Sequence, residues 1–139
     1  MAKILVSACL LGCKCRYDAK LKTCEKVKAL AADNILIPVC PEQMGGLTTP
    51  RNPSERVGDK VIMNNGTDVT ENYRTGAETA LMIAELNGVD YAILKSGSPA
   101  CGSGLIYDGS FSGKKIPGDG VAAELLKKNG FQVKTEEEI

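Results

Sequence analysis

The chain alternates short apolar runs with longer segments whose apolar residues recur at helical spacing. The short runs are rich in Val, Ile and Leu, and Gly, Pro or Ser residues bound them, a pattern typical of buried strands that end in loops. The predicted strands are Lys3–Ser7, Ile35–Val39, Asp90–Leu94 and Phe131–Lys134.

Helices are predicted in the segments that separate these strands. Their expected bounds are Cys24–Ala32, Thr70–Asn87 and Gly120–Asn129. The longest has a core face of Tyr73 and small alanines, which favours close approach to a sheet, and Gly88 follows its last residue as a terminator. Side chains able to cap the helix starts are Thr23, Thr70 and Asp119.

Two further regions give weaker signals. The stretch from Cys40 to Thr67 is rich in Pro, Gly and Asn; so long an irregular segment is usually functional or contains extra strands, and Lys60–Met63 is predicted as one. The pair Asp108-Gly109 predicts a hairpin turn between Leu105–Tyr107 and Ser110–Phe111. The acidic C-terminal tail is predicted to be frayed.

The order of these elements predicts the fold. Strands that alternate with helices favour a parallel sheet with right-handed crossovers. A chain of 139 residues is long enough for one domain with a real core. We therefore expect a single domain over residues 1–139, with a small three-layer α/β/α (Rossmann-like) fold and a mostly parallel sheet.

Composition removes several classes of function. The chain has 17 Lys plus Arg against 17 Asp plus Glu, so bulk charge gives no case for nucleic-acid or anionic-membrane binding. No apolar run approaches the ~20 residues of a membrane span. The first residues lead straight into a strand, without the apolar core of a signal peptide. We expect a soluble cytoplasmic protein.

Three of the six cysteines lie in turns at the ends of apolar runs. They are Cys9 in Ser-Ala-Cys, Cys40 in Cys-Pro-Glu and Cys101 in Ser-Pro-Ala-Cys-Gly. Because ligands bind at strand ends in open α/β sheets, these thiols could meet at one edge of one sheet. In the cytosol such cysteines are more often reduced, metal-bound or catalytic than paired.

The chain contains no histidine, so a metal here would be held by sulfur. Three thiolates without a nitrogen donor suit an iron–sulfur cluster. When three cysteines hold four iron atoms, one iron has no protein ligand and can act as a Lewis acid. Independent buried cysteines, a disulfide and a zinc site are alternatives, although structural zinc favours closely paired ligands.

Over nearly the whole chain, the sequence resembles the short thiouracil desulfidases. The shared segments begin with Ser-Ala-Cys-Leu-Leu-Gly at 7–12, Cys-Arg-Tyr-Asp at 15–18, Cys-Pro-Glu at 40–42, and Gly-Gly-Leu followed by Pro-Arg at 45–51. They continue with Leu-Lys-Ser at 94–96, Ser-Pro-Ala-Cys-Gly at 98–102, Ile-Tyr-Asp-Gly-Ser-Phe at 106–111 and Gly-Asp-Gly-Val at 118–121. Ala19 and Ala100 depart from the family, which more often has Gly and Ser there.

The resemblance implies a [4Fe–4S] cluster held by Cys9, Cys40 and Cys101. It also implies non-redox desulfuration of a thiolated pyrimidine, as a base or nucleoside, in which water supplies the new oxygen and sulfide is released. Glu42 would act as general acid/base and Ser98 would hydrogen-bond the substrate. The simpler interpretations are a solvated loop carboxylate and a turn-forming serine. The iron–sulfur assembly machinery is an implied partner.

A second function stays open: a metal- or redox-sensing thiol protein that binds zinc or a labile cluster without catalysis. Cys15 is interpreted as a thiol beside the cluster or a stand-in ligand, and Cys13 and Cys24 as incidental.

The remaining candidates, three arginines and two tyrosines, have two interpretations each. The arginines either hold an anionic part of the substrate or, the favoured interpretation, brace the long loop: Arg16, Arg51 and Arg56. The tyrosines either stack on a flat heterocycle or simply pack: Tyr17 and Tyr107.

Overall fold

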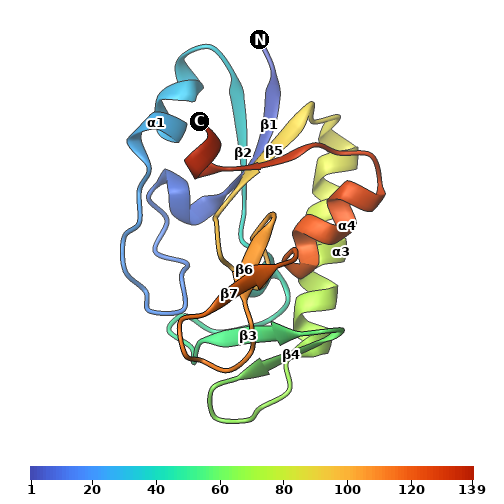
Figure 1. Ribbon diagram of the computed structural model, residues 1–139. Helices are drawn as coiled ribbons and strands as arrows, with labels where there is room; N and C mark the ends of the chain where they lie inside the picture. The colour runs from blue at the N-terminus through green and yellow to red at the C-terminus, as the bar shows by residue number, and fades with distance from the viewer.

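Four parallel strands form the central sheet of the computed structural model, which describes residues 1–139 (Figure 1). Their order across the sheet is β2-β1-β5-β8. Their bounds are β1 Lys3–Ser7, β2 Ile35–Val39, β5 Tyr91–Leu94 and β8 Val133–Thr135. Every neighbouring pair is parallel. The carboxyl ends therefore lie along one edge, as the alternation of predicted strands and helices indicated.

Helices cover both faces of this sheet, which confirms the three-layer α/β fold. Helices α3 (Thr70–Asn87) and α4 (Val121–Lys128) lie on one face, and α1 (Glu25–Lys28) lies on the other (Figure 1). Leu5 belongs to the core beneath α3 and α4, while Ile4 and Val6 belong to the core beneath α1. The alternation follows from the two-residue period of a strand. None of the helices is both long and apolar enough to cross a membrane.

The long helix α3 has the bounds predicted for it. Gly88 adopts a left-handed conformation. Its N–H donates to the Glu85 carbonyl and the Val89 N–H donates to the Ala84 carbonyl, which closes the last turn. The predicted cap at Thr70 is wrong, because Val69 is the capping position and the Thr70 hydroxyl instead accepts a hydrogen bond from the Val61 amide, 3.0 Å away. Helix α3 therefore fixes the strand that contains Val61.

The stretch from Cys40 to Thr67 contains a short helix and a hairpin. Helix α2 (Pro41–Met44) follows β2 directly, and β3 (Ser54–Val57) pairs antiparallel with β4 (Lys60–Met63). The prediction of β4 is confirmed, whereas α2 and β3 were not predicted. A Cβ on Gly76 of α3 would lie only 1.8 Å from the Pro41 carbonyl oxygen. Glycine there lets α2 pack directly against α3.

The second hairpin differs from the prediction. Strand β6 (Leu105–Tyr107) is confirmed, but its antiparallel partner is β7 (Lys115–Pro117), not Ser110–Phe111. The Asp108 carboxylate accepts hydrogen bonds from the amide and hydroxyl of Ser110, which bends the chain locally. The segment between the strands is therefore a wide loop.

Three further expectations at segment ends are wrong. Thr23 and Asp119 do not cap α1 and α4, whose capping positions are Cys24 and Gly120. The Asp119 carboxylate instead accepts a hydrogen bond from the Gly104 amide at 2.9 Å. The acidic tail forms a short 3-10 helix, η3 (Glu136–Glu138), closed by a capping box with Thr135. The predicted helix Cys24–Ala32 consists of α1 followed by a second 3-10 helix, η2 (Ala29–Ala32).

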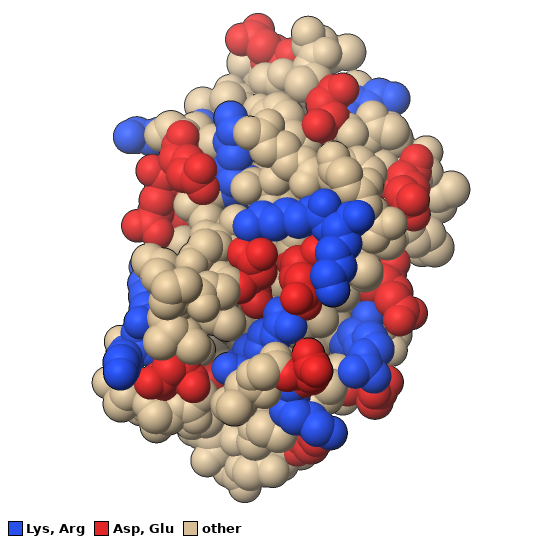
Figure 2. All heavy atoms as spheres, turned by 45° about the vertical axis from the view of Figure 1, so that its right-hand side comes forward, with Lys and Arg blue, Asp and Glu red and all other residues tan.

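Charged residues of both signs mix on the surface. The face shown in Figure 2 carries Lys and Arg beside Asp and Glu, with no broad area of one sign. This distribution agrees with the zero net charge of the chain.

Candidate functional site

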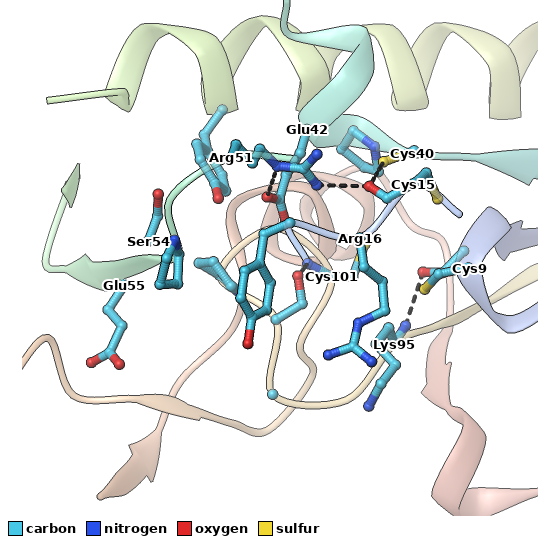
Figure 3. A pocket seen from close by; sticks show the side chains of 18 of the residues that line it. Cys9, Cys15, Arg16, Cys40, Glu42, Arg51, Ser54, Glu55, Lys95 and Cys101 are labelled. Atoms are coloured by element: carbon cyan, nitrogen blue, oxygen red, sulfur yellow. Dashed lines mark hydrogen bonds and ion pairs between the residues drawn. The ribbon is translucent and has the colours of Figure 1, made fainter. Parts of the chain in front are cut away.

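A cavity of about 380 Å³ lies at the carboxyl ends of the strands, and it brings the predicted thiols together. Cys9, Cys40 and Cys101 all line it, and so do Glu42 and Ser98 (Figure 3). The walls come from the segments after β1, β2 and β5 and from both hairpins. The sheet-edge placement expected from the sequence is therefore what the fold produces.

Local backbone geometry fixes each of the three thiols in a turn. Cys9 lies in the 3-10 helix η1 (Ala8–Leu11), which ends at Gly12 with a φ of 104°, a conformation that glycine adopts without strain. Cys40 occupies the capping position of α2. The amide of Cys101 donates to the Ser98 hydroxyl oxygen at 3.1 Å. Each turn follows a sheet strand directly or closely, so the sheet holds the thiols in place.

Cys15 is a fourth thiol in the cavity, where the sequence suggested a thiol beside the three proposed ligands or a stand-in for one of them. It is 5% exposed, and its thiol interacts with those of Cys40 and Cys9. Its backbone carbonyl accepts a hydrogen bond from the Cys40 thiol at 3.7 Å. Cys13 and Cys24 do not line the cavity. The C-x-C spacing alone did not separate Cys15 from Cys13; the family resemblance at Cys-Arg-Tyr-Asp, residues 15–18, did.

Burial keeps these thiols protonated in the protein alone. It raises the pKa of Cys101 to about 12. Contact with the Cys15 thiol, together with burial, raises the pKa of Cys40 well above its ordinary value. For Cys15, the Cys40 thiol lowers the pKa, but Cys9 and burial outweigh it and leave the pKa at about 11. Metal ligation by these groups would displace protons.

Arg51 lines the cavity and holds Glu42 by an ion pair. Its Nε donates to Oε1 of Glu42 at 3.0 Å, and its side chain is 3% exposed. Its other nitrogens donate to the carbonyl of Cys15 at 2.9 Å and to the carbonyl of Thr48 at 3.0 Å. Arg51 thus ties the Glu42 helix to the segment that contains Cys15, which confirms bracing as its role in the fold.

The other two arginines, Arg56 and Arg16, have different surroundings from each other. Arg56 braces β3 against α4, because it donates to the Asp119 carbonyl at 2.7 Å and to the Glu124 carboxylate at 2.8 Å. Arg16 lines the cavity and pairs only with Asp18, at 3.4 Å. Bracing is therefore confirmed for Arg56, whereas the guanidinium of Arg16 faces the cavity (Figure 3).

Tyr73 of α3 also reaches the cavity, although the sequence marked it only as a core residue. Its side chain is 1% exposed, and it lines the cavity. Burial, reinforced by the negative charge of Glu42, raises the pKa of Tyr73 well above its usual value. Its hydroxyl therefore keeps its proton beside the Glu42 carboxylate. An aromatic residue within an otherwise small-residue helical face is the sequence signal for this position.

The C-terminal helix η3 supports the segment after β5. Glu136 accepts hydrogen bonds from the Ser96 amide at 2.7 Å and from Lys95 Nζ at 2.9 Å. Burial alone would raise the pKa of Glu136, but Lys95 and Ser96 outweigh it and hold the pKa below its ordinary value. Lys95 and Ser96 both line the cavity. The tail expected to be frayed is thus fixed to the wall of the site.

The donor set fits a multinuclear iron–sulfur cluster better than a single metal ion. No group of three His, Cys, Asp or Glu side chains is arranged to hold one ion. A four-iron cluster is ligated at separate iron atoms, so its cysteines stand farther apart, around a cavity. Cys9, Cys40 and Cys101 surround such a cavity, and sulfur is the ligand that these clusters require.

Comparisons with known proteins show the family to which the chain belongs. The model of the 2-thiouracil desulfurase family matches residues 4–138, so the chain belongs to that family. The uncharacterized protein YbbK of Bacillus subtilis (strain 168) is 44% identical over 98% of this chain and 97% of its own length. A solved structure described as the [4Fe-4S]-dependent thiouracil desulfidase TudS superposes with a TM-score of 0.94. It is 45% identical, and the match covers 100% of this chain and 93% of that one.

Proposed function

We propose that this protein replaces the sulfur of a thiolated pyrimidine, such as thiouracil, with oxygen from water. The reaction converts one C=S bond and one water into one C=O bond and hydrogen sulfide, so nothing is oxidised or reduced. The observation that carries the proposal is the convergence of Cys9, Cys40 and Cys101 on one cavity. Membership of the 2-thiouracil desulfurase family and the similarity to TudS support the substrate class.

We assign the cofactor and its ligands on the same basis. A [4Fe–4S] cluster held by Cys9, Cys40 and Cys101 supplies an open iron, a Lewis acid with high affinity for sulfur. The Cys40 and Cys101 thiols have raised pKa values and are protonated in the protein alone, so loading releases their protons. We expect the iron–sulfur assembly machinery to deliver the cluster, and we expect the protein to work in the cytoplasm.

Glu42 is the group we propose to move protons during the reaction. Arg51 engages Oε1 of its carboxylate, which leaves Oε2 available to water. The carboxylate can accept a proton from the attacking water and return it to the departing sulfur, as general acid–base catalysis requires. Tyr73 lies beside it with its own proton retained, and helps to orient the carboxylate.

Ser98 combines the two roles considered for it. Its hydroxyl oxygen accepts hydrogen bonds from the amides of Ala100 and Cys101, each at 3.1 Å, which shapes the turn that carries the third thiol. The hydroxyl proton is not used in those bonds, and the hydroxyl also lies within hydrogen-bond reach of the Cys101 thiol. We propose that it donates to the substrate, since Ser98 lines the cavity.

The test is product formation by protein reconstituted with iron and sulfide without oxygen. Uracil and sulfide should form in equal amounts from 2- or 4-thiouracil. Absence of product from every thiolated base and nucleoside tried would contradict the proposed activity, while leaving the cluster assignment intact. The alternative of a sensor without catalysis predicts that Glu42→Gln leaves function unchanged, whereas the proposed enzyme loses turnover.

A further inference from the structure

The loop that connects β6 and β7 places an aromatic ring at the cavity in an unfavourable backbone conformation. Phe111 has a φ of 56°, in the left-handed region that residues with a Cβ rarely adopt. Phe111 lines the cavity and is 39% exposed. Backbone strain that persists at the wall of a site is a reason to look for a function there.

Glu55 of β3 holds this conformation. One carboxylate oxygen, Oε1, accepts hydrogen bonds from the Gly109 amide at 2.9 Å and from the Phe111 amide at 3.1 Å. Glu55 is 9% exposed and has no ion-pair partner. A buried carboxylate without a cation is costly unless hydrogen bonds compensate it. Here the two amides of the loop supply that compensation.

The aromatic rings named from the sequence are less available than Phe111. The Tyr17 ring has the Arg16 guanidinium over it, 5.7 Å from the ring centroid. The Tyr107 ring has the Lys115 ammonium at 5.3 Å. No cation lies over the Phe111 ring. Tyr73, the remaining aromatic residue of the cavity, is 1% exposed, so Phe111 is the exposed aromatic residue with no cation over its ring.

We infer that Phe111 is the residue on which the ring of the thiolated pyrimidine stacks, and that Glu55 is the positioning residue that holds it there. The inference rests on the proposed function and extends it to ring recognition. It explains why a left-handed backbone is retained at a bulky residue: the conformation presents the ring to the cavity. It also explains why a carboxylate with no cationic partner is buried in β3.

Binding of 2-thiouracil and of uracil by the reconstituted protein, measured by ligand-observed NMR, tests the ring contact. Phe111→Ala and Phe111→Gly should each raise the dissociation constant roughly tenfold, because they remove a stacking surface. In turnover assays KM should rise while kcat changes little. The control is Ile116→Ala, since Ile116 is 37% exposed in the same hairpin but does not line the cavity.

The two substitutions at Phe111 also separate the effect of losing the aromatic ring from the effect of the strained backbone. Glycine adopts a positive φ without cost, so Phe111→Gly should melt at a higher temperature than Phe111→Ala, although both bind poorly. Unchanged binding and KM in both variants, in a protein that desulfurates thiouracil, would overturn the inference. A wild-type protein that binds neither compound and releases no sulfide would instead contradict the proposed function itself.

Glu55 is tested through the loop that it holds. Glu55→Ala should accelerate hydrogen exchange at the Gly109 and Phe111 amides and raise KM, and Glu55→Gln should restore part of both, since an amide oxygen still accepts. The double variant Glu55→Ala/Phe111→Ala should bind no more weakly than Phe111→Ala alone. Additive losses would show that Glu55 does not act through Phe111. Glu78→Gln, at an exposed position on α3, is the matched control.

Discussion

The cavity has two walls that are built in different ways. The sheet-edge wall comprises Cys9, Cys40, Glu42 and Cys101, and the hairpin wall comprises Ser54, Glu55, Tyr107 and Phe111. The first follows strands and turns anchored in fully buried residues. The second belongs to two-stranded hairpins that lie outside the central sheet (Figure 1). Polar contacts of Glu55 and Arg56 hold them, together with buried apolar residues such as Val61. On the proposed function, the sheet edge holds the cofactor and the hairpin wall contacts the substrate.

Removing a thiol from the sheet-edge wall should have the largest effect. Cys40→Ser should lower iron content after anaerobic reconstitution and abolish sulfide release, because thiolates are the ligands that the cluster requires. Iron, acid-labile sulfide and turnover are measured together. Cys13→Ser is the control, since Cys13 is exposed and lies outside the cavity.

Cys15 tests which thiols of the sheet-edge wall are ligands, because it interacts with two of the three proposed ligands. If it is only a neighbouring thiol, Cys15→Ser keeps the iron content of the wild type. Loss of iron in this variant, together with retention in Cys9→Ser, would make Cys15 a ligand and revise the sheet-edge wall.

Neutralising Glu42 should separate chemistry from cofactor binding. Glu42→Gln should reduce kcat by about a hundredfold or more, the usual contribution of a general acid–base. Its iron content and visible spectrum should equal those of the wild type. Near-normal kcat would remove Glu42 from the reaction and favour a sensing function. Glu71→Gln on α3, 79% exposed, serves as the reference substitution.

Loosening the hairpin wall should change stability and KM but not iron content. Arg56→Ala removes three hydrogen bonds, to the carbonyls of Gly58 and Asp119 and to Glu124. Loss of these bonds, made by a guanidinium that is only 12% exposed, should lower the free energy of unfolding by about 1–3 kcal/mol, measured by urea titration. Arg74→Ala, whose side chain is 53% exposed in a surface pair with Glu71, should cost well under ~1 kcal/mol. Equal losses in both variants would contradict this attachment.

The smallest expected effect concerns pH and the C-terminal support of the sheet-edge wall. The folded pKa of Glu136 lies below its unfolded value of about 4.5, so its contribution to stability is present above that pH and is lost as the pH falls through the folded value. Glu136→Gln should therefore flatten the decline in unfolding free energy between neutral pH and the acid range. A wild type and variant with parallel pH curves would show that the Lys95 and Ser96 contacts do not carry this dependence.

Sequence patterns predicted the sheet-edge wall better than the hairpin wall, for a physical reason. Runs such as Ile4–Val6 predict a buried strand, because a strand that is buried on both faces needs continuous apolar residues. Cys9 and Cys40 could then be placed at strand ends by chain order alone. The hairpin strand Ser54–Val57 has no such pattern. It is held by contacts of Arg56 with Glu124 and of Glu55 with Gly109, and these partners lie far away in the sequence.

Phe111 shows the same limit. An aromatic residue after a Gly-Ser turn signal favours a strand on propensity, but the tertiary hydrogen bonds from Gly109 and Phe111 to Glu55 impose a left-handed turn instead. Ala19, where the family more often has glycine, also adopts a positive φ, of 57°. The sequence shows that alanine stands at this position, but only the structure shows that its φ is positive.

The most direct test of the central claim is the cluster content of the protein after anaerobic reconstitution, compared with a variant in which Cys9, Cys40 and Cys101 are all alanine. We predict about four irons and four labile sulfides with a broad absorption near ~400 nm in the wild type, absent in the variant. Equal iron and sulfide in both proteins, or none in either, would contradict the assignment of these three cysteines as the cluster site.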